Sequence, residues 1–306
     1  MNRVGFHRSH DTQPSRMMYL DSTDATHLTQ LTSHYTYAFK DAIETRAAEG
    51  MLVSLSSASI PYSFYNIRTG VNNVIHYNDT QVSLTAGNYN ATSLADTIMT
   101  AFSNNLEVSY SRTQQKYVFK NLDSSPIELK FEGFDDCLMA EIGFSLSSDQ
   151  DSRTFPYNTV KVAPNVADLN GSVHAIYVRT NLATRSVMES YTGGVSDILA
   201  KIDINSDPGG IITLDPQQVS HEALIHTDAV THIEIRLTDE RNRLLDLNGL
   251  HSQVGLRFRF VNIWVSAPEP VPDDRRRLAP KEVEAQAKKK GNKKQKVKET
   301  AQKILR

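Results

Sequence analysis

The second half of this 306-residue chain is a series of short strand-like segments, and this series limits the possible folds more than any other feature. The segments are apolar or alternate apolar with polar residues, and proline, glycine, asparagine or aspartate separates them. They are VHAIYVRTNL (173–182), SDILAKIDI (196–204), GIITLDP (210–216), HEALIH (221–226), VTHIEIRLTD (230–239), RLLDL (243–247) and VGLRFRFVNIWV (254–265). With hardly a helix between them, such segments predict an antiparallel sandwich.

The first half contains a second kind of pattern. Leu94, Ile98 and Phe102 recur at helical spacing, and either Asn90 or Thr92 can cap the helix that they predict. LEVSYSR and QKYVFKN then alternate around TQQ as a hairpin does, a strand is expected at 126–131, and DDCLMAEIGFS is expected to form a short helix ending at Gly143. We therefore expect a helix-containing α+β lobe at about 86–147, inserted into a sandwich domain of residues 46–266.

The two ends of the chain differ from this domain in composition. Residues 1–45 show no sustained periodicity and are expected to form an extended arm. The proline-rich SAPEPVPDD follows Val265, and residues 267–306 contain too few apolar side chains to order on their own. From Arg275 onwards the tail has 13 lysines and arginines against three glutamates, a net charge of +10, which leaves −12 on the rest.

The basic tail is the strongest electrostatic signal in the sequence. Its lysines are suited to contact nucleic acid, through counterion release, or an acidic partner protein. A solvated tail without a partner is the alternative. The candidate contact residues are Lys288, Lys289, Lys290, Lys293, Lys294, Lys296 and Lys298.

Composition excludes several classes of protein. The apolar runs are far shorter than the roughly 20 residues of a membrane-spanning helix, and no secretory signal is recognisable at the amino terminus. Cys137 is the only cysteine, so no intrachain disulfide and no cysteine-based zinc site is expected. Because Cys137 lies in an apolar segment that is expected to be helical, it is interpreted as an inert buried thiol.

The candidate catalytic and metal-binding patterns fail on spacing. His221 and His226 in HEALIH are five residues apart, whereas a zinc-protease helix needs four; they and His232 are interpreted as solvent-facing strand residues. A calcium loop starting at Asp239 would place Arg241 and Arg243 at ligand positions. A catalytic carboxylate pair near Asp239 lacks recognisable partner groups. The sequence predicts no catalytic residue, no metal site and no cofactor.

Several motifs resemble those of the penton-type minor capsid proteins of large eukaryotic DNA viruses, virophages and polinton-like elements. In the second half these are Ile204 and Asn205, the turn at Pro208 and Gly209, and a hairpin segment. The matching hairpin residues are Leu237, Thr238, Asp239, Leu245, Asp246, Leu247, Asn248 and Gly249. Asn242 stands where the family usually has glycine, which is tolerable because asparagine also enters the left-handed backbone region. SLSSASIPYSFYNI and the helix region resemble the first half of the family, so the resemblance covers roughly residues 17–265.

The resemblance implies a jelly-roll capsomer without enzymatic activity. Five copies would fill each fivefold vertex of an icosahedral shell tiled by major capsid protein trimers, beside other minor capsid proteins, with the tail facing the genome or an acidic internal protein. The protein would then be found in the virion and be assembled in the host cytoplasm or nucleus. Two further functions remain open: a minor capsid protein that cements the lattice, and a receptor- or glycan-binding jelly roll.

Overall fold

The computed structural model describes residues 4–6, 15–45, 49–171, 173–183, 187–214 and 221–265. The chain divides into two compact units, one made of residues 1–9 with 262–306 and one made of residues 10–261. In the described part of the smaller unit, β1 (Val4–Phe6) pairs antiparallel with the last residues of β20 (Gln253–Val265). The larger unit contains two separate hydrophobic cores.

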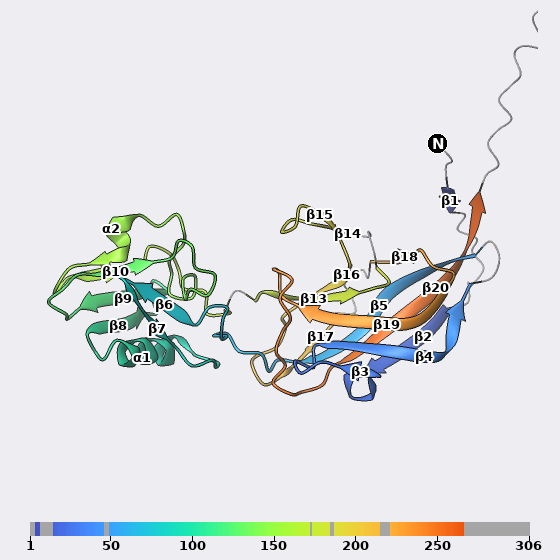
Figure 1. Ribbon diagram of the computed structural model, residues 1–306, viewed down its shortest axis with the longest axis horizontal. Coiled ribbons are helices and arrows are strands. Elements are labelled where there is room, and N and C mark those ends of the chain that lie inside the picture. Colours follow the sequence, from blue (N-terminus) through green and yellow to red (C-terminus); the bar gives the residue numbers. More distant parts are fainter. Residues whose placement is uncertain are drawn as a thin grey trace, which may run out of the picture. The chain divides into compact units, whose positions relative to one another are not determined.

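The first core lies in a sandwich of two antiparallel sheets (Figure 1). The first sheet has the order β2–β20–β5, and β17 and β18 both pair with β5, at opposite ends, so that they occupy one strand position. Besides β20 its strands are β2 (Ser15–Asp21), β5 (Glu49–Pro61), β17 (Ile211–Thr213) and β18 (Ala223–Ile225). The second sheet consists of β16 (Ile198–Asp203), β13 (Ala175–Thr180), β19 (Ala229–Thr238), β4 (His34–Glu44) and β3 (His27–Leu28), in that order.

The connectivity is that of a jelly roll. Eight strand positions follow along the chain as β2, β4, β5, β13, β16, β17 with β18, β19 and β20. The first pairs with the eighth, the second with the seventh, the third with the sixth and the fourth with the fifth, all antiparallel. This nested pairing places four of the eight strand positions in each of the two sheets. The expected jelly-roll sandwich is therefore confirmed.

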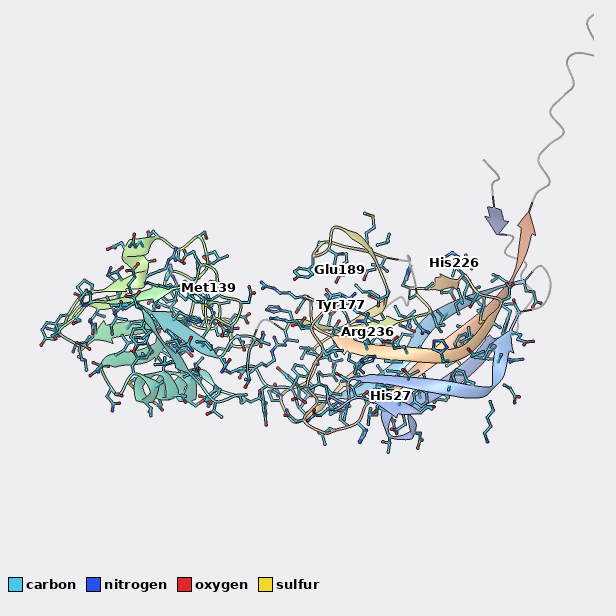
Figure 2. The ribbon with its side chains drawn as sticks, in the orientation of Figure 1. His27, Met139, Tyr177, Glu189, His226 and Arg236 are labelled. Atoms are coloured by element: carbon cyan, nitrogen blue, oxygen red, sulfur yellow. The ribbon has the colours of Figure 1, made fainter. Side chains whose placement is uncertain are left out.

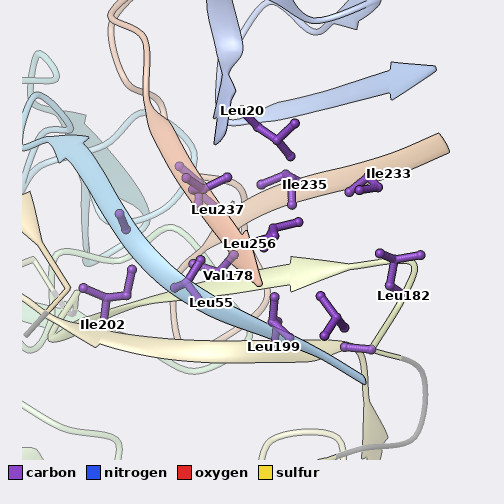
Figure 3. Packing of buried hydrophobic residues seen from close by; sticks show 14 of the residues in the cluster. Leu20, Leu55, Val178, Leu182, Leu199, Ile202, Ile233, Ile235, Leu237 and Leu256 are labelled. Atoms are coloured by element: carbon purple, nitrogen blue, oxygen red, sulfur yellow. The ribbon is translucent and has the colours of Figure 1, made fainter. Parts of the chain in front are cut away.

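The sandwich core is formed by the inward faces of both sheets. Alternation along β19 buries Ile233, Ile235 and Leu237 completely and leaves His232 exposed, as the period-2 pattern predicted. Figure 3 shows the β19 residues together with buried side chains of the other strands. They are Leu20, Leu55 and Leu256 of the first sheet and Val178, Leu199 and Ile202 of the second.

The second core belongs to a lobe inserted between β5 and β13 (Figure 1). It contains one sheet of order β11–β10–β6–β7, another of order β12–β9–β8, and two helices. The strands are β6 (Val74–Tyr77), β7 (Thr80–Ser83), β8 (Leu106–Ser111), β9 (Lys116–Asn121), β10 (Ile127–Lys130), β11 (Thr154–Phe155) and β12 (Val160–Val162). The helices are α1 (Ala91–Ala101) and α2 (Gln150–Arg153).

The helix α1 forms for the reasons that the sequence suggested. The side chain of Asn90 accepts hydrogen bonds from the backbone N–H groups of Thr92 and Ser93, and the hydroxyl of Ser93 accepts one from the backbone of Asn90. Leu94 and Ile98 are buried on one face of the helix. Asn90 rather than Thr92 is thus the capping residue.

Four sequence-based expectations are wrong in their details. The expected arm of residues 1–45 contains β2, β3 and β4 of the sandwich, because Tyr35 and Tyr37 alternate inwards along β4. The lobe core extends beyond the expected bounds of 86–147, from Ile67 to Ala163. Residues 135–145 form turns instead of a helix, and RLLDL makes only an isolated bridge, between Leu244 and Thr238.

No helix of the described residues is long and apolar enough to cross a membrane.

Candidate functional site

The segment that carries the family resemblance begins where β19 ends. Asp239 is fully buried at this point, and its Oδ1 accepts hydrogen bonds from the backbone N–H groups of Arg241 and Arg243, each at 2.9 Å. Its Oδ2 accepts one from Nε of Arg243 at 2.7 Å. Asn242 has φ = 60°, the left-handed conformation expected at this position. The carboxylate of Asp239 therefore determines the shape of the turn.

The rest of the segment is divided between core and surface. Leu245 and Leu247 are fully buried in the sandwich core, and the backbone N–H of Leu245 donates to the carbonyl of Leu237 at 3.1 Å. The side chain of Asp246 accepts a hydrogen bond from the backbone of Asn248 at 2.8 Å, and both residues are exposed. The signature thus combines apolar anchors with polar residues that shape two turns.

Asp239 also contacts the chain segment that leads into the lobe. Nη1 of Arg68, between β5 and β6, lies 3.3 Å from its Oδ2. Nη2 of Arg68 donates to the carbonyl of Gly171, on the segment that returns from the lobe, at 3.2 Å. Burial lowers the pKa of Arg68, and the charge of Asp239 partly opposes this effect. Sequence reasoning missed Arg68, because a single arginine after a turn gives no indication of a partner 171 residues away.

Glu240, the next residue, contacts the returning segment. One of its carboxylate oxygens accepts hydrogen bonds from the backbone N–H groups of His174, at 2.6 Å, and Ala175, at 3.1 Å. Together Asp239 and Glu240 therefore bind the segments that connect the lobe to β5 and to β13.

A second charged cluster lies beneath the hairpin of β14 (Val187–Glu189) and β15 (Gly194–Ser196). Arg179 on β13 is 1% exposed and donates to Thr238, Ser196 and Asp197 at 2.8 to 3.0 Å, and also to Glu189. Asp197 accepts a further hydrogen bond, from Arg236 on β19. Glu189 and Arg236 are labelled in Figure 2. These ion pairs connect β14 to the second sheet.

The ionisation of this cluster follows from its pairing. Burial alone raises the pKa of Asp197, but hydrogen bonds and charges from Arg179 and Arg236 outweigh it, so the pKa is lowered. Burial likewise acts to lower the pKa of Arg179, and the hydrogen bonds to Glu189 and Asp197 outweigh it, so that pKa is raised. Both groups are therefore stabilised in their charged forms.

The same hairpin exposes apolar side chains. Met188 is 79% exposed, Tyr191 62% and Val195 60%, although the ion pair of Glu189 ties the hairpin to the sheet. Large exposed apolar side chains that are held in place are typical of contact surfaces.

The remaining candidates of the sequence lie apart from these clusters. His221, His226 and His232 are exposed, as expected. Cys137 is half-buried and forms an isolated parallel bridge with Val74, which corrects the expected helix, and burial together with neighbouring carboxylates raises the pKa of its thiol to about 11. The tail lysines, from Lys288 to Lys298, lie outside the described residues.

Comparison with known proteins gives structural matches only. No protein-family model and no curated protein matches the sequence. A crystal structure of the selenomethionine-labelled mavirus penton protein matches with a TM-score of 0.47 and 9% identity, over 81% of this chain and 100% of that chain. VP17, a capsid protein of bacteriophage P23-77, matches with a TM-score of 0.17 and 8% identity, over 85% of this chain and 99% of its own. By its own strand order, the chain is a mainly β protein whose antiparallel jelly roll carries an inserted α+β lobe.

Proposed function

We propose that this chain is a structural capsid protein of the penton type, five copies of which form each fivefold vertex of an icosahedral virion. The observation that carries the proposal is the signature segment Leu237–Gly249, which resembles that of penton-type proteins and lies at the end of β19 in a jelly roll. The partners would be further copies of the chain, the surrounding major capsid protein trimers and other minor capsid proteins. The role requires no catalysis.

The arrangement of charge supports a structural role. The most deeply buried charged groups, Arg179 and Asp239, form ion pairs with side chains of the same chain, where they fix turns and strands. Buried pairs of this kind maintain a particular geometry, since losing one partner leaves an uncompensated charge. A subunit that must fit between two identical neighbours in a ring of five needs such a fixed geometry.

The hairpin β14–β15 is the proposed contact with the neighbouring copy. Burying a side chain of the size of Met188 or Val195 stabilises a contact by about 1.5 to 3 kcal/mol. Loss of both contacts, in a variant with Met188→Asp and Val195→Asp, should therefore weaken assembly by roughly 100-fold or more. Val160→Asp, at an equally exposed valine of β12 in the lobe, is the matched control.

Sedimentation velocity over a range of concentrations tests both statements. The monomer has a mass of 34.3 kDa, so a pentamer sediments as a species of about 172 kDa. The proposal predicts this species, or fivefold occupancy in a reconstruction of the particle. A chain found only at other lattice positions would contradict the penton assignment but leave a capsid role, whereas a monomer that binds glycans would favour the receptor-binding alternative. Equal assembly of the double variant and the wild type would contradict the hairpin contact alone.

A further inference from the structure

Three side chains with different metal-ligating atoms converge in the lobe. His76 on β6 is 7% exposed, and its Nε2 lies 3.0 Å from Oδ1 of Asp136. The thiol of Cys137 follows in sequence, and the ligand atoms of His76, Asp136 and Cys137 all lie within 4.8 Å of one another. Among the described residues, this is the group of histidine, cysteine and carboxylate side chains whose possible ligand atoms lie close enough to one another to share a metal ion.

The backbone fixes this convergence. Val74, two residues before His76, forms a parallel bridge with Cys137, and its N–H donates to the carbonyl of Asp136 at 3.0 Å. The N–H of Leu138 donates to the carbonyl of Val74 at 2.7 Å. On the other side, the ring of Phe134 stacks on the imidazole of His76 with centroids 3.7 Å apart. The three ligands are therefore held by hydrogen bonds between β6 and the turn that follows β10.

We propose that His76, Asp136 and Cys137 form a binding site for a divalent cation, with zinc as the best-fitting ion. One nitrogen, one carboxylate oxygen and one thiolate are ligand types that Zn²⁺ accepts, and three protein ligands with a free fourth position are a common zinc arrangement. Bonds of 2.0 to 2.3 Å in a tetrahedron place ligand atoms about 3.3 to 3.8 Å apart. Small side-chain rotations therefore suffice to bring atoms within 4.8 Å into that geometry.

The electrostatic surroundings favour a cation. Asp136, Asp135, Glu132 and Glu141 all contribute negative potential at the thiol of Cys137. A divalent ion would be neutralised by one thiolate and one carboxylate, while His76 binds as the neutral imidazole. Cys137 also lines a cavity of about 420 Å³, whose lining includes Asp135 and Glu141 as well as Arg68, Arg241 and Arg243, so it is the carboxylates next to the thiol that favour a cation.

A chain with one cysteine cannot form a zinc site with several cysteines. A mixed site needs only one, but its members are 60 residues apart in sequence, so that spacing gave no signal. Bound metal would join β6 to the turn at 131–144 and stabilise the lobe. The inference is independent of the capsid assignment.

The single cysteine makes the test specific. The full chain, freed of metal by a chelator, is treated with iodoacetamide with and without zinc chloride, and alkylation is followed by mass spectrometry. Because Cys137 is the only thiol, zinc bound at other histidines does not affect the readout. We expect zinc to slow alkylation at least tenfold in the wild type, and cobalt chloride to produce a thiolate-to-cobalt charge-transfer absorption.

Matched variants separate ligation from folding. Asp136→Asn and His76→Gln should lose most of the zinc protection, and Cys137→Ser should lose the cobalt absorption. His174→Gln is the control, because its imidazole also lies near two carboxylates, of Asp168 and Glu240, but without a thiol. Asp136 is partly exposed, so its variant should keep the circular dichroism of the wild type. Equal alkylation with and without zinc, or full protection in a folded Asp136→Asn variant, would overturn the proposal.

Discussion

Replacing Arg179 by methionine tests whether the buried ion pairs hold the β14–β15 hairpin on the sandwich. The change removes hydrogen bonds to Thr238, Ser196, Asp197 and Glu189 while keeping an unbranched apolar side chain. Asp197 retains Arg236 as a partner, so the main cost arises at Glu189, whose side chain is only 8% exposed. Breaking a buried pair in this way typically destabilises a protein by about 3 to 5 kcal/mol.

Glu189→Gln is the complementary variant. Glutamine can still accept a hydrogen bond, and Arg179 retains Asp197, so we expect a loss of about 1 to 2 kcal/mol. The double variant should lose about 2 kcal/mol less stability than the two single variants lose together. In the double variant the arginine and the glutamate are both replaced, so no buried charge of this pair is left without its partner.

Chemical denaturation at a fixed protein concentration measures these differences in the free energy of unfolding. Amide hydrogen exchange provides a local measurement, and it should accelerate at residues 187–196 in Arg179→Met while the centre of β19 stays protected. A loss below about 1 kcal/mol for Arg179→Met, or strict additivity in the double variant, would refute the reasoning.

Four further predictions concern single positions and the tail. Asn242→Ala should destabilise by about 1 kcal/mol in a denaturation experiment, since the φ of 60° costs alanine more, whereas Asn242→Gly should stay within about 0.5 kcal/mol of the wild type. Gly171→Ala should be far more destabilising than Gly193→Ala. A Cβ added at Gly171 lies 2.1 Å from a backbone oxygen, whereas a Cβ added at Gly193 meets no atom within 4 Å. Equal melting temperatures of the two variants would contradict this prediction. Because folding lowers the pKa of Asp197, its ionised form stabilises the folded protein fully above the unfolded pKa of about 3.8, and this stabilisation is lost as the pH falls through the folded pKa. The denaturation midpoint of Asp197→Asn should therefore fall less steeply with decreasing pH than that of the wild type. Deleting residues 275–306 should abolish any salt-dependent DNA binding in a filter or anisotropy assay, and an unchanged binding curve would contradict nucleic-acid contact by the tail.

The strands of the second half could be predicted because their signals are local. From Ile233 to Leu237 of β19 every second residue is apolar, and the turn that follows contains residues suited to a reversal, so this sheet face and the end of the strand follow from the sequence. The helix α1 has both its cap and its apolar spacing within a few residues of each other.

The parts that could not be predicted depend on distant residues. Strand β4 contains Lys40 and Asp41 and lies in a polar region, yet it pairs with β19 over much of its length, and that pairing is what determines it as a strand. Arg179 looks like an exposed strand residue in the sequence, and only the return of Glu189 and Asp197 to the same place makes it a buried one. Likewise His76 and Asp136 are joined by the fold alone.

The charged residues after β19 shape a turn and bind neighbouring segments of the same chain. Asp239 is fully buried, and one carboxylate oxygen of Glu240 accepts hydrogen bonds from the backbone N–H groups of His174 and Ala175, so both side chains have partners within the chain. Asp239 instead pairs with Arg68 at the entry to the lobe, and Arg68 binds the carbonyl of Gly171 at its exit. The turn after β19 therefore contacts both segments that connect the lobe to the jelly roll. For the proposed assembly, exposed ion pairs contribute little to the stability of a contact, which leaves apolar residues such as Met188 as the better candidates.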